Sequence, residues 1–290
     1  MIYVSATNRK LTEKYVDWAV QGLPDAKKLE PTEIVNKTDC TKAVIFGVLR
    51  GTHLVYKWAE RNKIDFYYMD RPYWGETRNA PFYTRIVKNN HLKSWQENRP
   101  DDRFKKSFPW PINPWKKKGK NIIVCPPTNA IQEFFGVHDW LNSTIEILKA
   151  NTDRPIIVKN KGYNPIIGFD KNGGYMVTGK DNTKPSGPID WDNAYAIVTF
   201  NSNITLEATT RGVPCFTDNH NACAPISETD FSKIETPKYL DREPLYHSMA
   251  YGQFTAEEMG NGTAFKILDE TDRFPTAEER WPRTGVVANG

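Results

Sequence analysis

The segment AYAIVTFNSNITLEATTRGVPCFT, residues 194–217, restricts the possible folds of this chain more than any other. Its apolar run AYAIVTF predicts a buried strand, ITLEATT predicts a helix that ends at Gly212, and the residues after Gly212 predict another strand. A strand, a helix and a second strand in this order are typical of a parallel sheet covered by helices. The segment therefore predicts an α/β fold.

The same alternation recurs in two other parts of the chain. KAVIF, HLVYKWAERNK and IDFYYMD predict a strand, a helix and a strand near residues 42–70, and NIIVC, HDWLNSTIEILKANT and RPIIVK predict the same order near residues 121–159. Four prolines from Pro100 to Pro114 argue against regular elements, so we place the connection between two α/β domains there. We expect an N-terminal domain of residues 1–112, a C-terminal domain of residues 113–270 and a loose polar tail, 271–290.

Composition excludes several classes of protein. Hydrophobic residues make up 39% of the chain and charged residues 26%, as in globular proteins. No apolar run approaches the length of about 18 residues that crosses a bilayer, and the start of the chain lacks the pattern of a secretion signal. We therefore expect a cytoplasmic protein without a membrane partner. The cysteines form no Cys-x-x-Cys pair, which argues against a zinc site and a disulfide framework.

The polar turn Asn201-Ser202-Asn203 is the leading candidate for a binding site. In an open α/β sheet, ligands bind beyond the carboxyl ends of the strands, where loops lead into helices. Amide groups at the start of a helix favour a phosphate, and Glu207, one turn further on, would reach the hydroxyls of a ribose attached to it. The same residues also fit a capped helix with an ordinary surface glutamate.

Two lysines extend this candidate site. Lys159 and Lys161 alternate at the end of RPIIVKNK, so both side chains would point the same way and neutralise a diphosphate leaving group. A solvated strand end is the alternative. Thr128, in the turn after NIIVC, is a further candidate for this ligand.

A second candidate site lies in the N-terminal half. Asp70 closes the strand IDFYYMD, where a carboxylate would accept a proton from an acceptor hydroxyl, although it could equally cap a turn. Arg50 lies in a glycine-bounded turn and would hold a phosphate or an acceptor, with a structural salt bridge as the alternative. The aromatic and basic residues that follow Asp70 add the candidate acceptor contacts Arg71, Tyr73 and Trp74.

The linker is both basic and aromatic. Lys105, Lys106 and the run 116–120 alternate with Phe104, Phe108, Trp110 and Trp115, a pattern that suits a phosphate backbone and an exposed base. Lys116 and Lys117 are therefore candidate acceptor contacts. The alternative is a solvated linker with its aromatic rings packed underneath. No Walker or Gly-x-Gly-x-x-Gly motif and no catalytic histidine spacing is present, which argues against nucleotide hydrolysis and dinucleotide redox chemistry.

The segment 194–217 resembles the donor-binding half of GT-B glycosyltransferases, and capsule-polysaccharide transferases of the Kdo type carry a similar segment. Together with GVLRGT, DFYYMDRPYWG, DRPIIVK and DREPLYHSMAYGQFTAEEMGNG, it makes the chain similar to a family of phage-encoded glycosyltransferases over residues 44–268. This resemblance implies two Rossmann-like domains that face each other across a cleft, with a nucleotide-sugar donor in the C-terminal domain and an acceptor in the N-terminal one.

The resemblance also assigns roles to single residues. Ser202, Asn203 and Glu207 fall on the donor motif, and Asp70 falls where several GT-B enzymes keep an acid/base carboxylate. The capsule enzymes have a His-Pro pair after the strand that here ends in Lys159 and Lys161. This difference favours a uridine-diphosphate sugar, whose extra phosphate suits two lysines, over a cytidine-monophosphate donor. We expect the sugar to be glucose, so the expected donor substrate is UDP-glucose. No cofactor and no metal are expected, since there is no Asp-x-Asp motif.

The acceptor implied by the phage resemblance is a 5-hydroxymethyl-pyrimidine in DNA, which fits the basic aromatic linker and would require the nucleotide to leave the duplex. One alternative keeps the enzyme and changes the acceptor to a surface polysaccharide or a lipid-linked glycan. Another is a DNA-binding α/β module without catalytic activity, which would have no need for Glu207.

Overall fold

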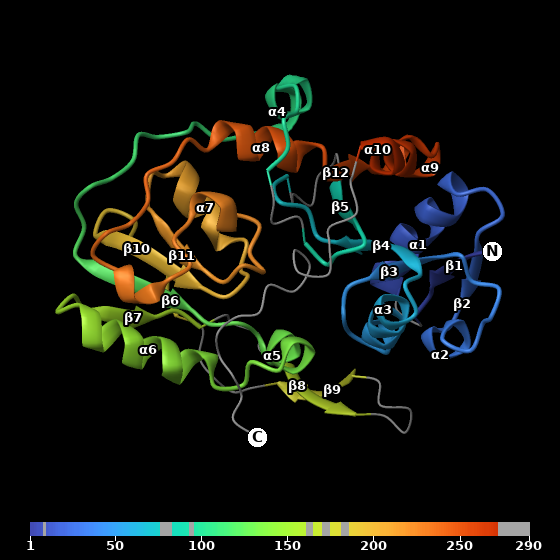
Figure 1. Ribbon diagram of the computed structural model, residues 1–290, viewed down its shortest axis with the longest axis horizontal. Helices are drawn as coiled ribbons and strands as arrows, with labels where there is room; N and C mark the ends of the chain where they lie inside the picture. The colour runs from blue at the N-terminus through green and yellow to red at the C-terminus, as the bar shows by residue number, and fades with distance from the viewer. Residues whose placement is uncertain are drawn as a thin grey trace.

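The computed structural model describes residues 1–7, 10–75, 83–92, 96–160, 165–169, 175–180 and 186–271. Over these residues the chain folds into two main sheets with helices around them, and the predicted α/β class is confirmed (Figure 1). The predicted tail lies outside the described residues except for its first residue. No described helix combines the length and the apolar character needed to span a membrane.

The first sheet has six strands in the order β12-β5-β4-β3-β1-β2. They are β1 (Ile2–Ser5), β2 (Lys27–Leu29), β3 (Lys42–Phe46), β4 (Asp65–Asp70), β5 (Tyr83–Lys88) and β12 (Gln253–Thr255). Strands β1 to β4 run parallel to one another, whereas β5 is antiparallel to β4 and β12 is antiparallel to β5. The predicted unit near residues 42–70 is confirmed as β3, helix α3 (Thr52–Arg61) and β4.

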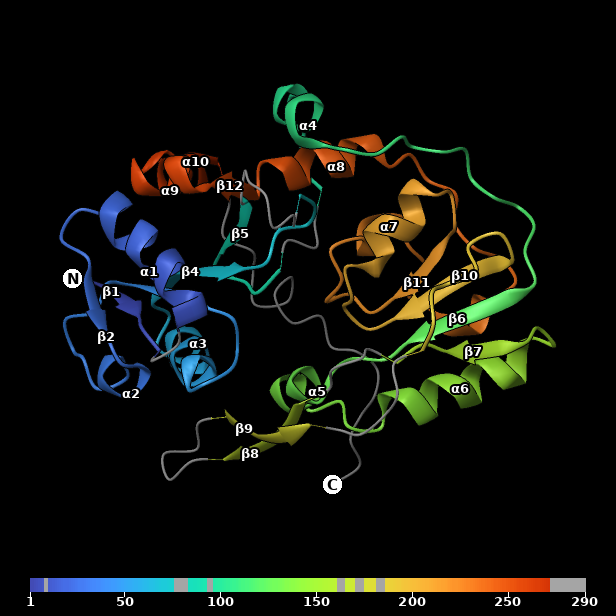
Figure 2. The same ribbon diagram turned by 180° about the vertical axis from the view of Figure 1, so that it is seen from behind.

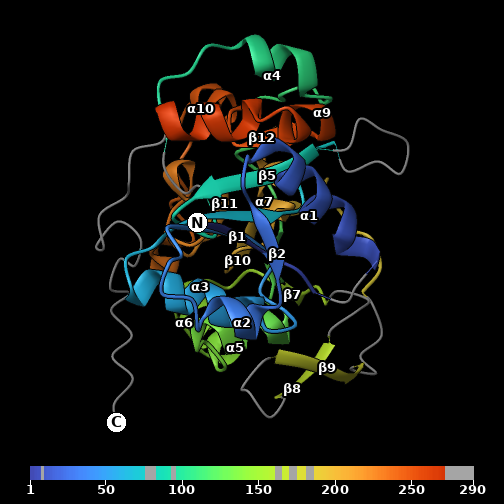
Figure 3. The same ribbon diagram turned by 90° about the vertical axis from the view of Figure 1, so that its right-hand side faces the viewer.

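Helices cover both faces of this sheet (Figure 3). On one face, α3 and α2 (Pro31–Ile34) pack against a core that includes Ile45 and Tyr68. On the other face, α1 (Lys10–Gly22), α9 (Ala256–Gly260) and α10 (Thr263–Thr271) pack against a core that includes Val44 and Tyr67. Successive residues of a strand point to opposite faces, so the central strands β3 and β4 contribute to both cores and are apolar between their ends.

The second sheet has four parallel strands in the order β11-β10-β6-β7. They are β6 (Asn121–Cys125), β7 (Ile156–Val158), β10 (Ala194–Thr199) and β11 (Cys215–Thr217), with α5 (Asn129–Phe135) and α6 (Trp140–Asn151) between β6 and β7. Helix α7 (Ile204–Thr210) connects β10 to β11, which confirms the unit predicted from residues 194–217. Beside α5, β8 (Pro165–Phe169) and β9 (Tyr175–Lys180) form an antiparallel pair (Figure 1).

The linker differs from the expectation in one respect. It contains a helix, α4 (Asp102–Ser107), so the absence of regular elements that the prolines predict is wrong for these residues. The prolines lie on either side of α4 and none lies within it. Asp102 in the first turn and Lys105 in the last complement the helix dipole. Helix α4 lies beside α8 (Glu243–Ala250) (Figure 2).

After the second sheet the chain returns to the first. It passes through the short helices η1 (Ala224–Ile226) and η2 (Phe231–Lys233), then through α8 into β12, which pairs with β5. Residues 253–271 therefore pack on the first sheet, although the predicted C-terminal domain, residues 113–270, includes most of them. The two halves are thus joined by the linker and by α8.

A hydrophobic cluster also joins the halves. Tyr73, Trp74 and Leu92 from the first half pack in one buried group with Leu206 of α7 and with Tyr246 of α8. This cluster fixes the loop after β4 against α7 and α8, and so brings the carboxyl ends of β4 and β10 toward each other.

Candidate functional site

A cavity of about 370 Å³ opens at the carboxyl ends of β6, β7 and β10. Lys159 follows β7, Ser202 follows β10, Glu207 lies on α7, and residues 186–191 form the facing wall. Ligand sites of open α/β sheets lie at this edge, and small-molecule sites have volumes of about 300–1,000 Å³. The structure thus brings together Lys159, Ser202 and Glu207, which the sequence predicts as parts of one site.

The turn before α7 is held by side chains. Ser202 Oγ accepts the N–H of Ile204 at 3.4 Å, and the Ser202 carbonyl accepts the Asn221 amide at 3.3 Å. Asn221 Oδ1 in turn accepts the hydroxyl of Thr205 at 3.0 Å and the N–H of Cys223 at 2.8 Å. These bonds keep the Ser202 hydroxyl at the cavity edge.

Lys159 supplies a positive charge to the cavity. Its ammonium donates to the carbonyl oxygens of Gly187 at 3.0 Å and Pro188 at 2.9 Å. An ammonium has three N–H donors, so within the described part of the chain one remains for a ligand. Asn160 and Ser186 exchange hydrogen bonds beside it, which ties the wall formed by residues 186–191 to the end of β7. The second predicted lysine, Lys161, lies outside the described residues.

Trp191 is an aromatic wall of the cavity that the sequence reasoning missed. The guanidinium of Arg211 lies 5.0 Å from its ring centre, and Glu207 holds Arg211 in an ion pair at 3.0 Å. The carbonyl of Trp191 accepts the Lys116 ammonium at 2.9 Å. Lys116, a predicted acceptor contact, therefore supports the cavity wall. The available signal was a tryptophan in a Gly-, Pro- and Asp-containing loop just before a buried strand.

Asp70 lies at the end of β4, with its side chain 33% exposed. Its Oδ2 is 2.9 Å from Arg85 Nη2, and its Oδ1 accepts the N–H of Arg71 at 2.8 Å. The Tyr68 hydroxyl donates to Asp70 at 3.4 Å; burial, and then the charge of Asp70, raise the pKa of Tyr68 well above its usual value. The loop after Asp70 reaches the second half, since the Asn203 amide donates to the Pro72 carbonyl at 3.3 Å.

The other predicted acceptor contacts are spread out. Arg50 is exposed at a φ of +60° between β3 and α3, and Arg71 and Lys117 are also exposed. Tyr73 and Trp74 are 5% and 2% exposed, so they contribute to the shared cluster and present little surface to an acceptor. The Trp74 indole N–H donates to Ser107 Oγ at 3.1 Å, which ties the loop to α4.

Three predicted donor contacts lie outside the cavity lining. Asn201 follows β10 and is half-buried, and Asn203 is exposed and turned to Pro72. Thr128 immediately precedes α5, and its carbonyl accepts the N–H of Ile131 at 2.9 Å.

The aromatic residues of the linker pack largely against the fold. Phe104 and Phe108 lie against the shared cluster, and the Phe108 ring stacks on Tyr246 with 5.3 Å between their centres. The Trp115 indole donates to the Leu240 carbonyl at 2.9 Å. Trp110 is 42% exposed. The predicted alternative, aromatic rings packed under a solvated linker, is confirmed for the first three of these residues.

Two histidines meet where the halves contact. The ring of His91, after β5, lies 6.0 Å from that of His220, after β11, and 4.9 Å from that of Phe135 in α5. Asp218 holds His220 through its ring Nδ1 and its backbone N–H. Burial, and then His220, lower the pKa of His91 well below its usual 6.5, so its ring is neutral. These residues are scattered in the sequence, and the spacing of histidines alone does not reveal the contact.

No protein-family model and no curated protein matches the chain. Among solved structures, it is similar to Thermosulfurimonas dismutans KpsC, beta Kdo 2,4 transferase, at 11% identity and a TM-score of 0.49, over 92% of this chain and 97% of that one. It is also similar to Thermosulfurimonas dismutans KpsC, beta Kdo 2,7 transferase, at 11% identity and a TM-score of 0.47, over 93% of this chain and 99% of that one. Both TM-scores are below 0.5, and neither likeness assigns a function to this chain.

Proposed function

We propose that the protein is a glycosyltransferase of the GT-B arrangement that binds a nucleoside-diphosphate sugar, UDP-glucose in the first instance, in the cavity beside α7. The observation that carries the proposal is the meeting of an aromatic ring, a carboxylate and an ammonium, from Trp191, Glu207 and Lys159, around one cavity at the carboxyl ends of parallel strands. These three groups match the base, the ribose and the diphosphate of a nucleotide sugar.

Each of these groups suits one part of the donor. The Trp191 ring offers a stacking surface for the base. Arg211, which is not part of the cavity lining, packs on the Trp191 ring and holds it in place. Glu207 accepts hydrogen bonds from ribose hydroxyls, and the Arg211 partner fixes its carboxylate. The remaining N–H of Lys159 and the Ser202 hydroxyl bind the diphosphate. Lys161 would add a second positive charge.

The proposed reaction joins the two halves. Asp70 accepts the proton of an acceptor hydroxyl, whose oxygen attacks the anomeric carbon of the sugar. The bond from that carbon to the diphosphate oxygen breaks, and the diphosphate leaves with its added negative charge stabilised by Lys159. Asn203 keeps the Asp70 loop beside the donor half through Pro72.

Two acceptors are candidates. The resemblance to phage enzymes favours a hydroxymethylated pyrimidine in DNA, and the exposed Lys106 and Lys117 supply charge for a phosphate backbone. A glycan hydroxyl is favoured by the packing of Phe104, Phe108 and Trp115, which leaves Trp110 as the exposed ring among the four aromatic residues predicted to stack on a base.

The test begins with thermal unfolding in a panel of nucleotide sugars, where a ligand that binds the folded protein raises Tm. The stabilising donor is then incubated, in labelled form, with hydroxymethylated DNA and, separately, with neutral oligosaccharides. We expect a UDP-sugar to raise Tm and label to appear on one acceptor by mass spectrometry. A panel in which no nucleotide sugar raises Tm would overturn the proposal, whereas label on the oligosaccharides alone would remove DNA as the acceptor.

A further inference from the structure

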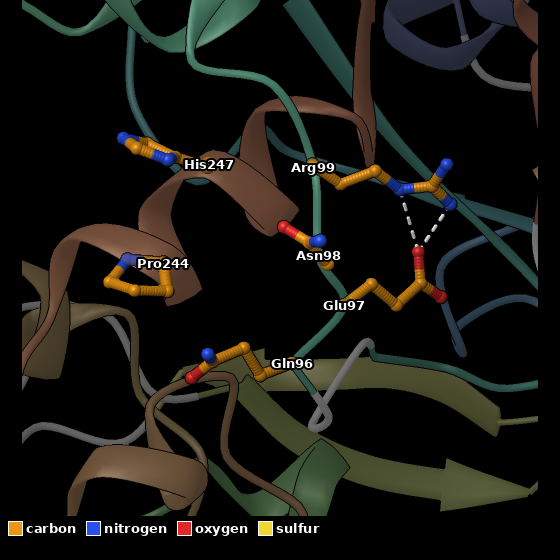
Figure 4. Close-up of a pocket in the computed structure, with 6 residues that line it drawn as sticks. All are labelled: Gln96, Glu97, Asn98, Arg99, Pro244 and His247. Carbon is orange, nitrogen blue, oxygen red and sulfur yellow. Dashed lines mark hydrogen bonds and ion pairs between the residues drawn. The ribbon is translucent and has the colours of Figure 1, made fainter.

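A second cavity, of about 400 Å³, lies between the extended segment 96–99 and helix α8 (Figure 4). The segment is fixed to the helix, because the N–H of Glu97 donates to Ser248 Oγ at 3.2 Å. The guanidinium of Arg99 lies 5.3 Å from the ring centre of Tyr251, just beyond the end of α8. The groove between segment and helix is therefore a built feature of the fold.

The charged side chains of this groove neutralise each other. Glu97 and Arg99 lie on the same side of the extended segment and form an ion pair, with 15% and 12% of their side chains exposed (Figure 4). Their pairing leaves the groove without a net charge from these two residues. A polyanion such as a nucleic acid would need cations that are not already paired.

Neutral polar side chains lie on the other side of the segment from Glu97 and Arg99, the side that faces α8 (Figure 4). Gln96 and Asn98 turn toward α8, where Pro244 and His247 lie one turn apart (Figure 4). Both amides are exposed, so their donor and acceptor atoms are accessible to a ligand. The His247 ring is steadied by Phe104, with 4.9 Å between the ring centres.

These groups suit a saccharide. A side-chain amide donates and accepts at the same time, as two neighbouring sugar hydroxyls do, and a proline ring packs against the C–H face of a sugar. We propose that the groove binds a neutral, hydroxyl-rich oligosaccharide. The inference rests on the proposed function in that it identifies the acceptor chain as a glycan.

The position of α8 connects the groove to the candidate site. The buried side of α8 packs in the cluster that contains Leu206 of α7 and Trp74 of the loop after Asp70, while Pro244 and His247 face the groove. Helix α8 thus contacts both α7 and the loop after Asp70, which carry the proposed chemistry. A glycan bound on the outer side of α8 therefore lies on the helix that supports both of them.

The test is saturation-transfer difference NMR without donor, using maltotriose, cellotriose and triacetylchitotriose as probes and a short oligodeoxythymidine as the competitor. We expect transfer to at least one trisaccharide, and binding weaker by roughly tenfold or more in the Asn98→Ala/His247→Ala variant. The matched control is Asn142→Ala/His138→Ala, which removes an exposed amide and imidazole elsewhere and should bind like wild type. Gln96→Ala, at an exposed position, is a single variant that tests the same groove with little effect on folding.

Three outcomes would overturn the inference. The first is that no trisaccharide receives transfer, and the second is that transfer is equal in wild type and in both groove variants. The third is that the oligonucleotide displaces the trisaccharide. The Tm increase with a UDP-sugar, measured on the same samples, reports the donor cavity separately. If no trisaccharide binds but a UDP-sugar still raises the Tm of wild type, the glycan site alone is refuted. If no UDP-sugar raises the Tm of wild type, the proposed function is refuted.

Discussion

Asp70 is the residue on which the proposed chemistry depends most. Its sequence position admits a general base or a turn cap, and the structure shows it accepting the Arg71 N–H and pairing with Arg85. Arg85 is 8% exposed at its side chain, so the pair has a structural role as well. The Asp70 side chain is still one-third exposed, so a hydroxyl can approach it.

Asp70→Asn separates the catalytic role from the structural one. We expect turnover to fall by about two to four orders of magnitude, because an amide cannot accept the acceptor proton. The Kd for the donor, measured by calorimetry, should stay near the wild-type value, since the donor cavity lies in the other half. The control is Asp65→Asn at the opposite end of β4. Wild-type turnover in Asp70→Asn would remove this residue from the mechanism.

At the level of elements, those whose signal lies in consecutive residues were predicted, and those that depend on contacts between distant residues were not. β10 is buried at every position, so its apolar run is visible in the sequence itself. The wall formed by residues 186–191 was not predictable, because it depends on bonds from Lys159 and Asn160 to residues 26–29 positions away. Trp191 becomes a cavity residue through those contacts and the one from Lys116. Helix α4 was missed because the flanking prolines dominated the pattern.

Gly212 sets the junction between α7, β11 and the linker. Its φ is +80°, and a Cβ there would overlap the Pro114 carbonyl oxygen, so we expect Gly212→Ala to lower the free energy of unfolding by more than about 1 kcal/mol. Urea denaturation measures this change. The matched control is Gly187→Ala, since a Cβ at that position meets no atom of the described residues within 4 Å. Equal stability of the two variants would contradict the close approach of the linker.

At the level of the whole molecule, the sequence predicted two α/β halves, but not how they hold together. The return of the chain through α8 to β12 depends on the pairing of β12 with β5 across a long separation, which local patterns do not encode. The same holds for the contact of His91 with Phe135 and His220. Cavity residues from β7, α7 and the wall 186–191 meet only because the sheet aligns its strand ends.

The buried, neutral His91 makes stability depend on pH. Its folded pKa lies well below the unfolded value of 6.5, so unfolding takes up a proton below that pH. Stability should therefore be unaffected by His91 above about pH 6.5 and fall below it by up to about 1.4 kcal/mol per pH unit. Urea denaturation between pH 5 and 7.5 should show a smaller slope for His91→Gln than for wild type or for the exposed-site control His138→Gln. Parallel slopes in all three proteins would show that His91 does not titrate on unfolding.

The most direct measurement is the Kd for UDP-glucose, by isothermal titration calorimetry, of wild type, Trp191→Ala, Glu207→Ala and the surface control Glu146→Ala. Base stacking contributes about 1–3 kcal/mol, so Trp191→Ala should bind roughly 5- to 140-fold more weakly. Glu207→Ala should show a loss of similar size, while Glu146→Ala, exposed on α6, should match wild type. Wild-type affinity in both cavity variants would contradict the assignment of this cavity to the donor.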